Sequence, residues 1–194
     1  MKTLTNEQAV DWIKSTGLHA RSEWGEYVHE GETFNGWERE ITLPDKTGFG
    51  FTVRLPRLLA YQVPYLASSF LPGTYQQLEP FLFWITDNGA TGELGFNLAC
   101  RMITMLRAVH GETRPILESP AYLFESSEGD DARMLASMAV LFSWNVYLVP
   151  QHGRYFVWID DDEFTDVWCR TEKDYNRLLA QFEEWNPSKI ETEG

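Results

Sequence analysis

The sequence predicts an α+β fold in which a mixed, mainly antiparallel sheet packs against helices. Three observations predict it: short apolar or alternating segments bounded by turn residues, several helical segments with recognisable caps, and a composition in the globular range. Hydrophobic residues make up 43% and charged residues 23% of the 194-residue chain, which excludes wholesale disorder. We expect a single globular domain over residues 1–186 and a disordered tail over residues 187–194.

The first element is a predicted helix over residues 6–16. Thr5 and Gln8 have the spacing of a capping box, and Gly17 suits the left-handed residue that ends a helix. Residues 18–37 show neither a helical nor a strand period, so a loop or short irregular strands are expected. A hairpin is expected next, pairing residues 39–43 with 49–55. Gly50 in its second strand indicates a bulge or a close backbone approach.

The middle of the chain predicts two helices around one buried strand. The first helix covers residues 57–70 and is interrupted by Pro64. Residues 81–85 form a continuous apolar run that is typical of a buried strand. The second helix covers residues 93–109, and its apolar residues near one face predict the side that packs on the core. These residues are Leu94, Leu98, Met102, Met105, Leu106 and Val109.

The last third predicts the most regular structure. A strand at residues 122–124, an apolar helix at 130–142 and a strand at 146–149 predict a βαβ crossover, right-handed if its two strands are parallel. Strands at 155–159 and 164–169 follow. Thr171 is the predicted N-cap of a closing helix over residues 172–185. Its apolar stripe consists of Tyr175, Leu178, Leu179, Phe182 and Trp185.

The chain is strongly acidic, with 29 acidic and 16 basic residues and a formal net charge of −13. This balance argues against non-specific binding to nucleic acids or anionic membranes. Residues 121–194 alone carry 15 acidic and 6 basic residues. A field of one sign steers association with partners of the other sign, although a solvated face that keeps the protein soluble has the same composition.

Cysteine usage and hydropathy indicate a soluble, cytoplasmic protein without a cofactor. Cys100 and Cys169 are the two cysteines, and no CxxC motif is present, so buried free thiols are expected rather than a disulfide framework or a zinc site. The N-terminal residues lack the apolar run of a signal peptide, and no apolar stretch reaches the length of a membrane span. Oligomeric state is left open.

Searches for catalytic motifs find no specific signature. Gly89, Gly92 and Gly95 lie between a predicted strand and a predicted helix, but their spacing is not that of a dinucleotide fingerprint and no P-loop lysine follows. The histidines lack the spacing of a helical zinc site, and no Gly-x-Ser-x-Gly motif is present. A small enzyme or ligand-binding domain remains the alternative, with a site assembled from distant polar residues. Its candidate residues are His29, His152, Asp87 and Arg170.

Two acidic or aromatic segments are the predicted binding residues. Trp24, Tyr27, Phe34 and Trp37 are interleaved with glutamates and glycines. Such rings either fill a small core, stack on a small ligand, or anchor a protein partner. The acidic run has the residues Asp160, Asp161, Asp162 and Glu163, with Asp166 close by. Its spacing is not that of an EF-hand, and it is either a solvated turn, a docking patch for a basic protein, or a metal site.

These observations together favour a non-enzymatic, acidic protein-binding domain that recognises a basic protein partner. Acidic side chains would steer such a partner, and exposed rings would anchor it. In charge and size the chain resembles small immunity or inhibitor proteins, which mask basic partners.

Overall fold

The computed structural model describes residues 1–29, 32–44, 48–54, 62–73, 77–87, 96–160 and 164–190. Its strands are β1 (Lys2–Leu4), β2 (His19–His29), β3 (Glu32–Thr42), β4 (Phe49–Arg54), β5 (Phe81–Asp87), β6 (Ala121–Phe124), β7 (Asn145–Pro150), β8 (Tyr155–Ile159), β9 (Phe164–Cys169) and β10 (Ser188–Ile190). Its helices are α1 (Asn6–Ser15), α2 (Val63–Phe70), α3 (Phe96–Val109), α4 (Gly129–Leu141) and α5 (Glu172–Gln181), with two short 3₁₀ turns, η1 (Ile116–Glu118) and η2 (Glu183–Trp185).

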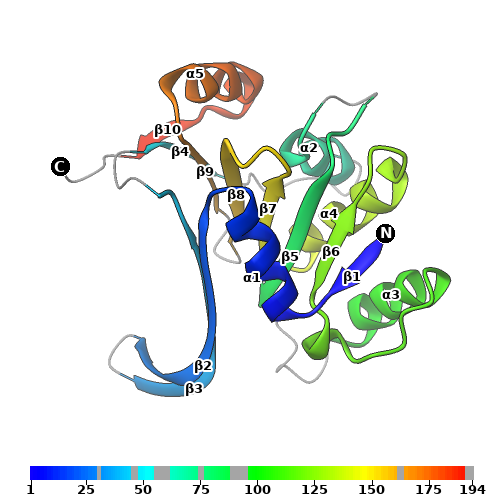
Figure 1. Ribbon diagram of the computed structural model, residues 1–194. Helices are drawn as coiled ribbons and strands as arrows, with labels where there is room; N and C mark the ends of the chain where they lie inside the picture. Colours follow the sequence, from blue (N-terminus) through cyan, green and yellow to red (C-terminus); the bar gives the residue numbers. More distant parts are fainter. Residues whose placement is uncertain are drawn as a thin grey trace.

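An eight-stranded sheet in the order β1-β6-β5-β7-β8-β9-β4-β10 forms the centre of the protein (Figure 1). Every neighbouring pair in this sheet is antiparallel. The strands β2 and β3 form a second, two-stranded sheet. The predicted α+β class is therefore confirmed.

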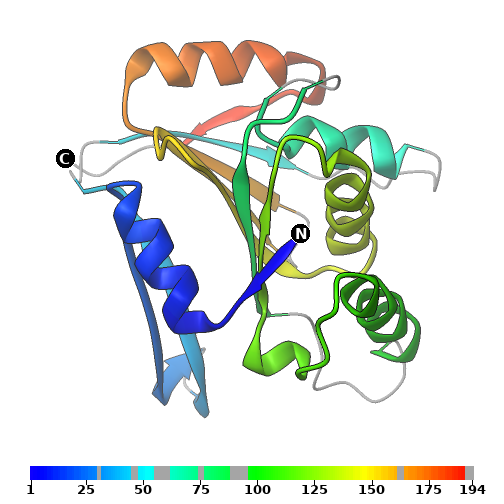
Figure 2. The same cartoon turned by 45° about the vertical axis from the view of Figure 1, so that its right-hand side comes forward.

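Both faces of the large sheet are covered, and each cover has its own apolar core. Along β5, Phe81, Phe83 and Ile85 belong to the core under α2, α3, α4 and α5. The alternate residues Leu82 and Trp84 belong to a smaller core under α1 and the base of the β2–β3 hairpin. Figure 2 shows α1 and this hairpin on one side of the sheet and α2, α3 and α4 on the other. The continuous apolar run predicted as a buried strand lies in β5. Its residues are apolar without alternation because both faces of the strand are enclosed.

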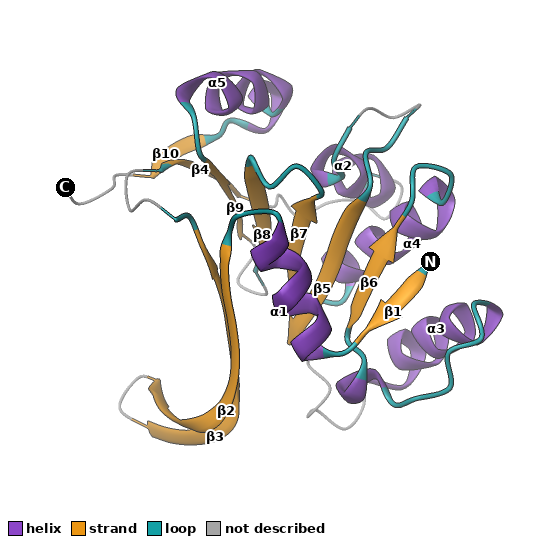
Figure 3. Ribbon diagram, viewed as in Figure 1, coloured by secondary structure: helices purple, strands orange, loops and turns teal. Residues whose placement is uncertain are grey.

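Residues 18–37 do not form a loop or short irregular strands, because most of them belong to the long β2–β3 hairpin. The two strands pair without interruption from His19 opposite Thr42 to His29 opposite Glu32. Much of the hairpin projects away from the large sheet (Figure 3). A ribbon with solvent on both faces needs no alternation of apolar and polar residues, so the sequence period was uninformative.

The predicted pairing of residues 39–43 with 49–55 is wrong. Residues 39–42 pair with residues 19–22, and β4 pairs with β9 on one side and β10 on the other. The turn residues 45–47 lie outside the described residues. Both segments were correctly predicted as strands, but each pairs with strands other than the predicted partner.

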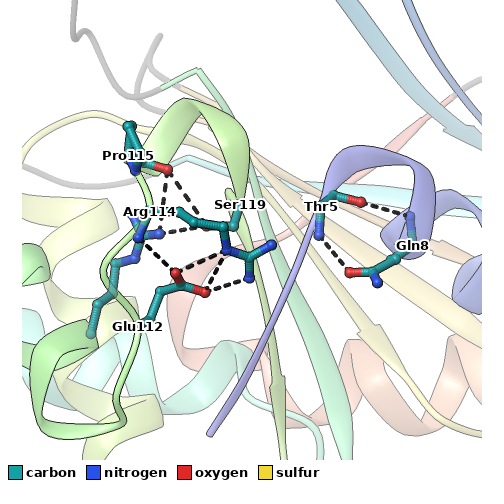
Figure 4. Close-up of polar contacts among 7 residues, drawn as sticks. Thr5, Gln8, Glu112, Arg114, Pro115 and Ser119 are labelled. Carbon is teal, nitrogen blue, oxygen red and sulfur yellow. Dashed lines mark hydrogen bonds and ion pairs between the residues drawn. The ribbon is translucent and has the colours of Figure 1, made fainter.

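The start of α1 follows the prediction closely (Figure 4). The backbone N–H of Gln8 donates to Oγ1 of Thr5 over 3.3 Å, and the backbone N–H of Thr5 donates to Oε1 of Gln8 over 3.0 Å. This is the reciprocal capping box. Gly17 has the predicted left-handed conformation, with φ of +83°.

The predicted crossover is present, but its two strands do not pair with each other. β6 and β7 each lie antiparallel to β5, one on either side, so they are parallel to one another with β5 between them. α4 connects them and packs on the main core through Leu135 and Ala136.

The core-facing side of α3 differs from the predicted one. Met102, Met105 and Val109 are 37%, 70% and 82% exposed, whereas Leu106 and the charged Arg107 are buried. Compared with the prediction, α3 is therefore rotated about its axis, and the contacts of the buried Arg107 guanidinium account for this rotation.

That guanidinium donates to Oγ of Ser119 and to the carbonyl oxygen of Pro115, and it lies 5.9 Å from the centre of the Tyr122 ring. Figure 4 shows Pro115 and Ser119 beside the Glu112–Arg114 pair in the segment between α3 and β6. A periodicity of apolar residues does not anticipate a buried arginine.

The C-terminal part confirms the predicted helix and corrects the predicted tail. Oγ1 of Thr171 accepts from the backbone N–H of Asp174 over 3.1 Å, as expected of an N-cap. α5 ends at Gln181 rather than 185, and η2 completes the segment. Residues 188–190 are not disordered: they form β10 at the edge of the large sheet, and residues 191–194 lie outside the described residues.

Several smaller expectations can be placed on this fold. Pro64 lies in the first turn of α2, and residues 55–61 lie outside the described residues. Cys169 is a buried free thiol, and burial raises its pKa to about 12. The side chain of Cys100 and the glycine-rich loop at 88–95 lie outside the description. Among the described helices, none combines the length and apolar sequence needed to cross a bilayer.

Candidate protein-binding surface

A polar network attaches the hairpin to the large sheet. Oδ1 of Asn6, at the start of α1, accepts from Nε1 of the buried Trp84 over 3.0 Å and from Nε of Arg39 on β3 over 3.1 Å. Nη1 of Arg39 also donates to the carbonyl oxygen of Thr86 on β5. Because Asn6 and Trp84 are buried, these bonds satisfy polar groups that are costly to leave unpaired. The hairpin base is thereby held against α1 and β5.

The hairpin concentrates negative charge. Residues 19–42 contain six glutamates and two arginines, a net charge of −4, which equals the net charge of the whole segment 1–120. Arg21 on β2 forms ion pairs with Glu38 and Glu40 on β3, with N–O distances of 2.6 and 2.7 Å. The hydrogen bond with Glu40 raises the pKa of Arg21. Glu23 and Glu26, further along β2, are exposed to solvent.

The four predicted aromatic residues lie on the two strands of this hairpin. Trp24 is opposite Trp37 and Tyr27 is opposite Phe34, so the register brings all four within four rungs of the ribbon. Trp24 is 63% exposed, so it is not a buried core residue. The side chains of Tyr27, Phe34 and Trp37 lie outside the description.

The acidic run can be placed only in part. Asp160 follows β8 and is half-buried, and its backbone N–H donates to the carbonyl oxygen of Phe164 over 2.9 Å. Asp161, Asp162 and Glu163 lie outside the described residues. The docking role predicted for this run is therefore not tested. The side-chain contacts of the nearby Asp166 are described.

Asp166 has a distinctive environment on β9. It lies opposite Trp158 on one neighbouring strand, β8, and opposite Thr52 on the other, β4. Phe164 and Trp168 are two residues away on β9 itself, so all five residues lie on the same face of the sheet. We call Trp158, Phe164 and Trp168 the aromatic frame of Asp166. Phe164 is 41% exposed, whereas Trp158 and Trp168 are partly buried against the smaller core.

A glycine provides room for one ring of the frame. Gly50 on β4 is the register partner of Trp168. A Cβ atom at Gly50 would lie only 3.0 Å from Cε3 and 3.1 Å from Cζ3 of that indole. The predicted close approach at Gly50 is therefore confirmed, and the uninterrupted register excludes the alternative of a bulge.

The carboxylate of Asp166 is half-buried, and burial raises its pKa. The hydroxyl of Thr52 opposes this rise, because it donates to Oδ1 of Asp166 over 2.6 Å. Within the described part of the chain, no cation forms an ion pair with Asp166. Arg54 belongs to the same face, but its guanidinium lies over the ring of Phe164, 5.9 Å from the centre.

Tyr147 on β7 extends the acidic and aromatic character toward the hairpin. Its ring stacks on Trp158, with the centres 6.1 Å apart and an interplanar angle of 19°. Burial raises the pKa of Tyr147 to about 12, and the nearby carboxylates of Glu40, Asp160 and Asp166 act in the same direction. A hydrogen bond with the backbone of Ile41 links Tyr147 to β3. Three carboxylates from three elements thus contribute negative potential to one region.

Sequence reasoning did not identify the aromatic frame. The signal was present as an alternation at spacing two: Trp158 near the end of one predicted strand with Asp160 directly after that strand, and Phe164, Asp166 and Trp168 on the next. Trp158 and Trp168 are partly buried against the smaller core, so aromatic residues alone do not mark this face. The pairing of β9 with β8 and β4, which places Asp166 between Trp158 and Thr52, follows only from the folded sheet.

The candidates for an enzymatic site have structural partners where they are described. Nε2 of His152 lies 2.9 Å from Oε2 of Glu79, an ion-pair distance without the direction of a hydrogen bond. Burial lowers the pKa of His152. The guanidinium of Arg170 donates to the carbonyl oxygen of Gly17, at the end of α1. The side chains of His29 and Asp87 lie outside the description, and the described residues contain no group of three potential ligands placed to hold a metal ion.

Comparison of the chain with protein-family models, with curated proteins and with solved structures gave no match.

Proposed function

We propose that the protein binds a basic protein partner through the projecting β2–β3 hairpin and the neighbouring acidic sheet face. The observation that carries this proposal is the exposed Trp24 on a hairpin with a net charge of −4. A large ring that remains in solvent on an acidic element matches the anchor-and-steering arrangement of protein interfaces.

Two further features support the proposal. The hairpin base is held by the Asn6–Arg39–Trp84 network, and anchoring one end of the hairpin lowers the entropic cost of binding through it. The carboxylates of Glu40, Asp160 and Asp166 extend the acidic region from the hairpin to the sheet. A basic partner would then meet a continuous negative potential.

The contribution of Trp24 can be worked out from its exposure. A tryptophan has roughly 150–250 Å² of side-chain surface. With 63% of it exposed, covering the ring would bury about 130 Å² and contribute about 3 kcal/mol. Trp24→Ala is therefore expected to weaken binding by about 100-fold. Because the ring is mostly outside the core, the free energy of unfolding should change by less than about 0.5 kcal/mol.

The test has two stages. The immobilised protein first retains partners from a lysate at low ionic strength, and retained proteins of high isoelectric point are purified. Titration calorimetry then compares the native chain with Trp24→Ala and with a Glu23→Gln/Glu26→Gln variant. Leu117→Ala is the control for the tryptophan, because Leu117 in η1 is also 63% exposed. Glu118→Gln/Glu183→Gln removes two exposed charges elsewhere.

The proposal requires weaker binding for both hairpin variants and unchanged binding for both controls, with affinity that falls as salt increases. It would be abandoned if Trp24→Ala bound the purified partner as tightly as the native chain. Equal losses in the hairpin and control variants would indicate non-specific attraction to an acidic protein instead.

A further inference from the structure

We propose that the aromatic frame of Asp166 binds a guanidinium group, that is, an arginine side chain. The inference rests on the proposed function for the source of this arginine, which is the basic protein partner. The site itself is defined by the described residues of three strands.

The geometry surrounds one carboxylate with rings. Cross-strand neighbours in an antiparallel sheet lie about 5 Å apart, and residues two apart on one strand lie about 7 Å apart. Trp158 flanks Asp166 across β8, and Phe164 and Trp168 flank it along β9. Thr52 occupies the fourth side and donates to Oδ1. The carboxylate therefore sits at the centre of a mostly apolar frame.

This arrangement suits a guanidinium better than other cationic groups. The guanidinium is planar, weakly hydrated and able to stack on an indole while its N–H groups donate to a carboxylate. Two indoles and a phenyl ring are the sheet neighbours of Asp166, so stacking partners stand beside an acceptor of N–H groups. An ammonium group is more strongly hydrated and lacks a flat surface for stacking.

The electrostatics point the same way. Partial burial disfavours the ionised form of Asp166, and a single hydroxyl is its hydrogen-bond donor among the described residues. A half-buried carboxylate without a cation is stabilised when an opposite charge arrives. Arg54 shares this face of the sheet, but its guanidinium lies over the ring of Phe164. Arg170, two residues after Trp168, donates to the carbonyl oxygen of Gly17, and the carboxylates of Glu40 and Asp160 add negative charge near Tyr147.

Gly50 on β4 lies next to the indole of Trp168. Because glycine has no side chain, the indole of Trp168 can approach the backbone of β4. The edge atoms Cε3 and Cζ3 of this ring thereby lie close to the backbone of β4, next to the rung formed by Thr52 and Asp166.

The experiment uses isolated amino-acid analogues, so that it is independent of the hairpin. Nitrogen-15 and proton NMR spectra record the indole N–H signals of the full chain during titration with N-acetylarginine methylamide. Trp158→Phe and Trp168→Phe identify the two signals of the frame. The citrulline analogue has nearly the same shape without the charge, and the lysine analogue has the charge without the plane.

The arginine analogue is expected to shift both signals in a saturable manner, with a Kd of about 1 mM or weaker, as befits one stacking and ionic contact. The citrulline analogue should cause no saturable shift, and the lysine analogue should bind several-fold more weakly. Asp166→Asn should abolish the shifts. Asp130→Asn is the matched control, because Asp130 is fully exposed at the start of α4, and it should bind as the native chain does.

Absence of shifts with the arginine analogue would overturn the inference, as would equal shifts with citrulline or lysine. If the arginine analogue fails while a purified basic partner still binds through Trp24, the proposed function survives and only the guanidinium site is lost. If the arginine analogue binds and Trp24→Ala leaves partner binding unchanged, the guanidinium site stands and the role of the hairpin is refuted.

Discussion

Replacing Asp166 by asparagine is expected to stabilise the unliganded protein at neutral pH. The amide oxygen of asparagine can still accept from the Thr52 hydroxyl, so the contact measured at 2.6 Å is retained. The substitution removes the charge, whose partial burial is unfavourable. A site that binds a cation at the expense of stability should show this opposition between binding and folding.

The size of the effect follows from the degree of burial. A fully buried, unpaired carboxylate costs several kcal/mol, but Asp166 is only half-buried and the remaining solvent screens its charge. The expected gain is therefore about 0.5–1 kcal/mol. The entropy of unfolding for 194 residues is about 0.4 kcal/mol/K, so the Tm should rise by about 1–3 °C.

The gain should depend on pH in a defined direction. Burial raises the pKa of Asp166 above 3.8, its value in the unfolded chain. Between pH 3.8 and the higher pKa of Asp166 in the folded protein, the native state binds more protons than the unfolded state. The native protein therefore loses stability as pH rises through this window. The advantage of Asp166→Asn is thus complete above the folded pKa and vanishes below 3.8.

Urea unfolding of both proteins at neutral pH and on either side of pH 3.8 measures this difference. Asp130→Asn, at a fully exposed position, should change stability by less than about 0.5 kcal/mol. The reasoning is refuted if Asp166→Asn is less stable than the native protein at neutral pH, or if their difference does not change with pH.

Two further substitutions test close approaches of the backbone. Gly50→Ala should displace the indole of Trp168, because the new Cβ would lie 3.0 Å from its Cε3. We expect a stability change within about 1 kcal/mol but a several-fold loss of affinity for the arginine analogue, measured by NMR titration; unchanged affinity would show that the position of this ring is unimportant. Gly153→Ala should destabilise the protein by about 2–4 kcal/mol in thermal unfolding, because φ is +58° and the new Cβ would lie 2.4 Å from the carbonyl oxygen of Thr16. A loss below about 1 kcal/mol would contradict the close contact between this turn and α1.

The candidate site was only partly predictable from the sequence. The glutamate- and glycine-rich surroundings of Trp24 predict a binding residue; the structure shows that Trp24 is exposed, and its binding role stays a prediction. The sequence indicates Asp166 only as a neighbour of the acidic run, and it does not single out Trp158 or Trp168. Their common surface depends on Thr52 and Gly50, which are more than a hundred residues away in the chain. Residue patterns within one segment contain no information about such a partner.

The sequence by itself determined the elements whose stability is local. The capping box at Thr5 and Gln8, the N-cap at Thr171 and the apolar run of β5 all act within a few residues, so they were recognisable before folding. Only the tertiary structure decided which strand pairs with residues 39–42, which face of α3 is buried and what surrounds Asp166. Strand partners and helix rotations are selected by the free energy of the whole assembled core, in which a buried Arg107 or a hairpin in solvent outweighs local periodicity.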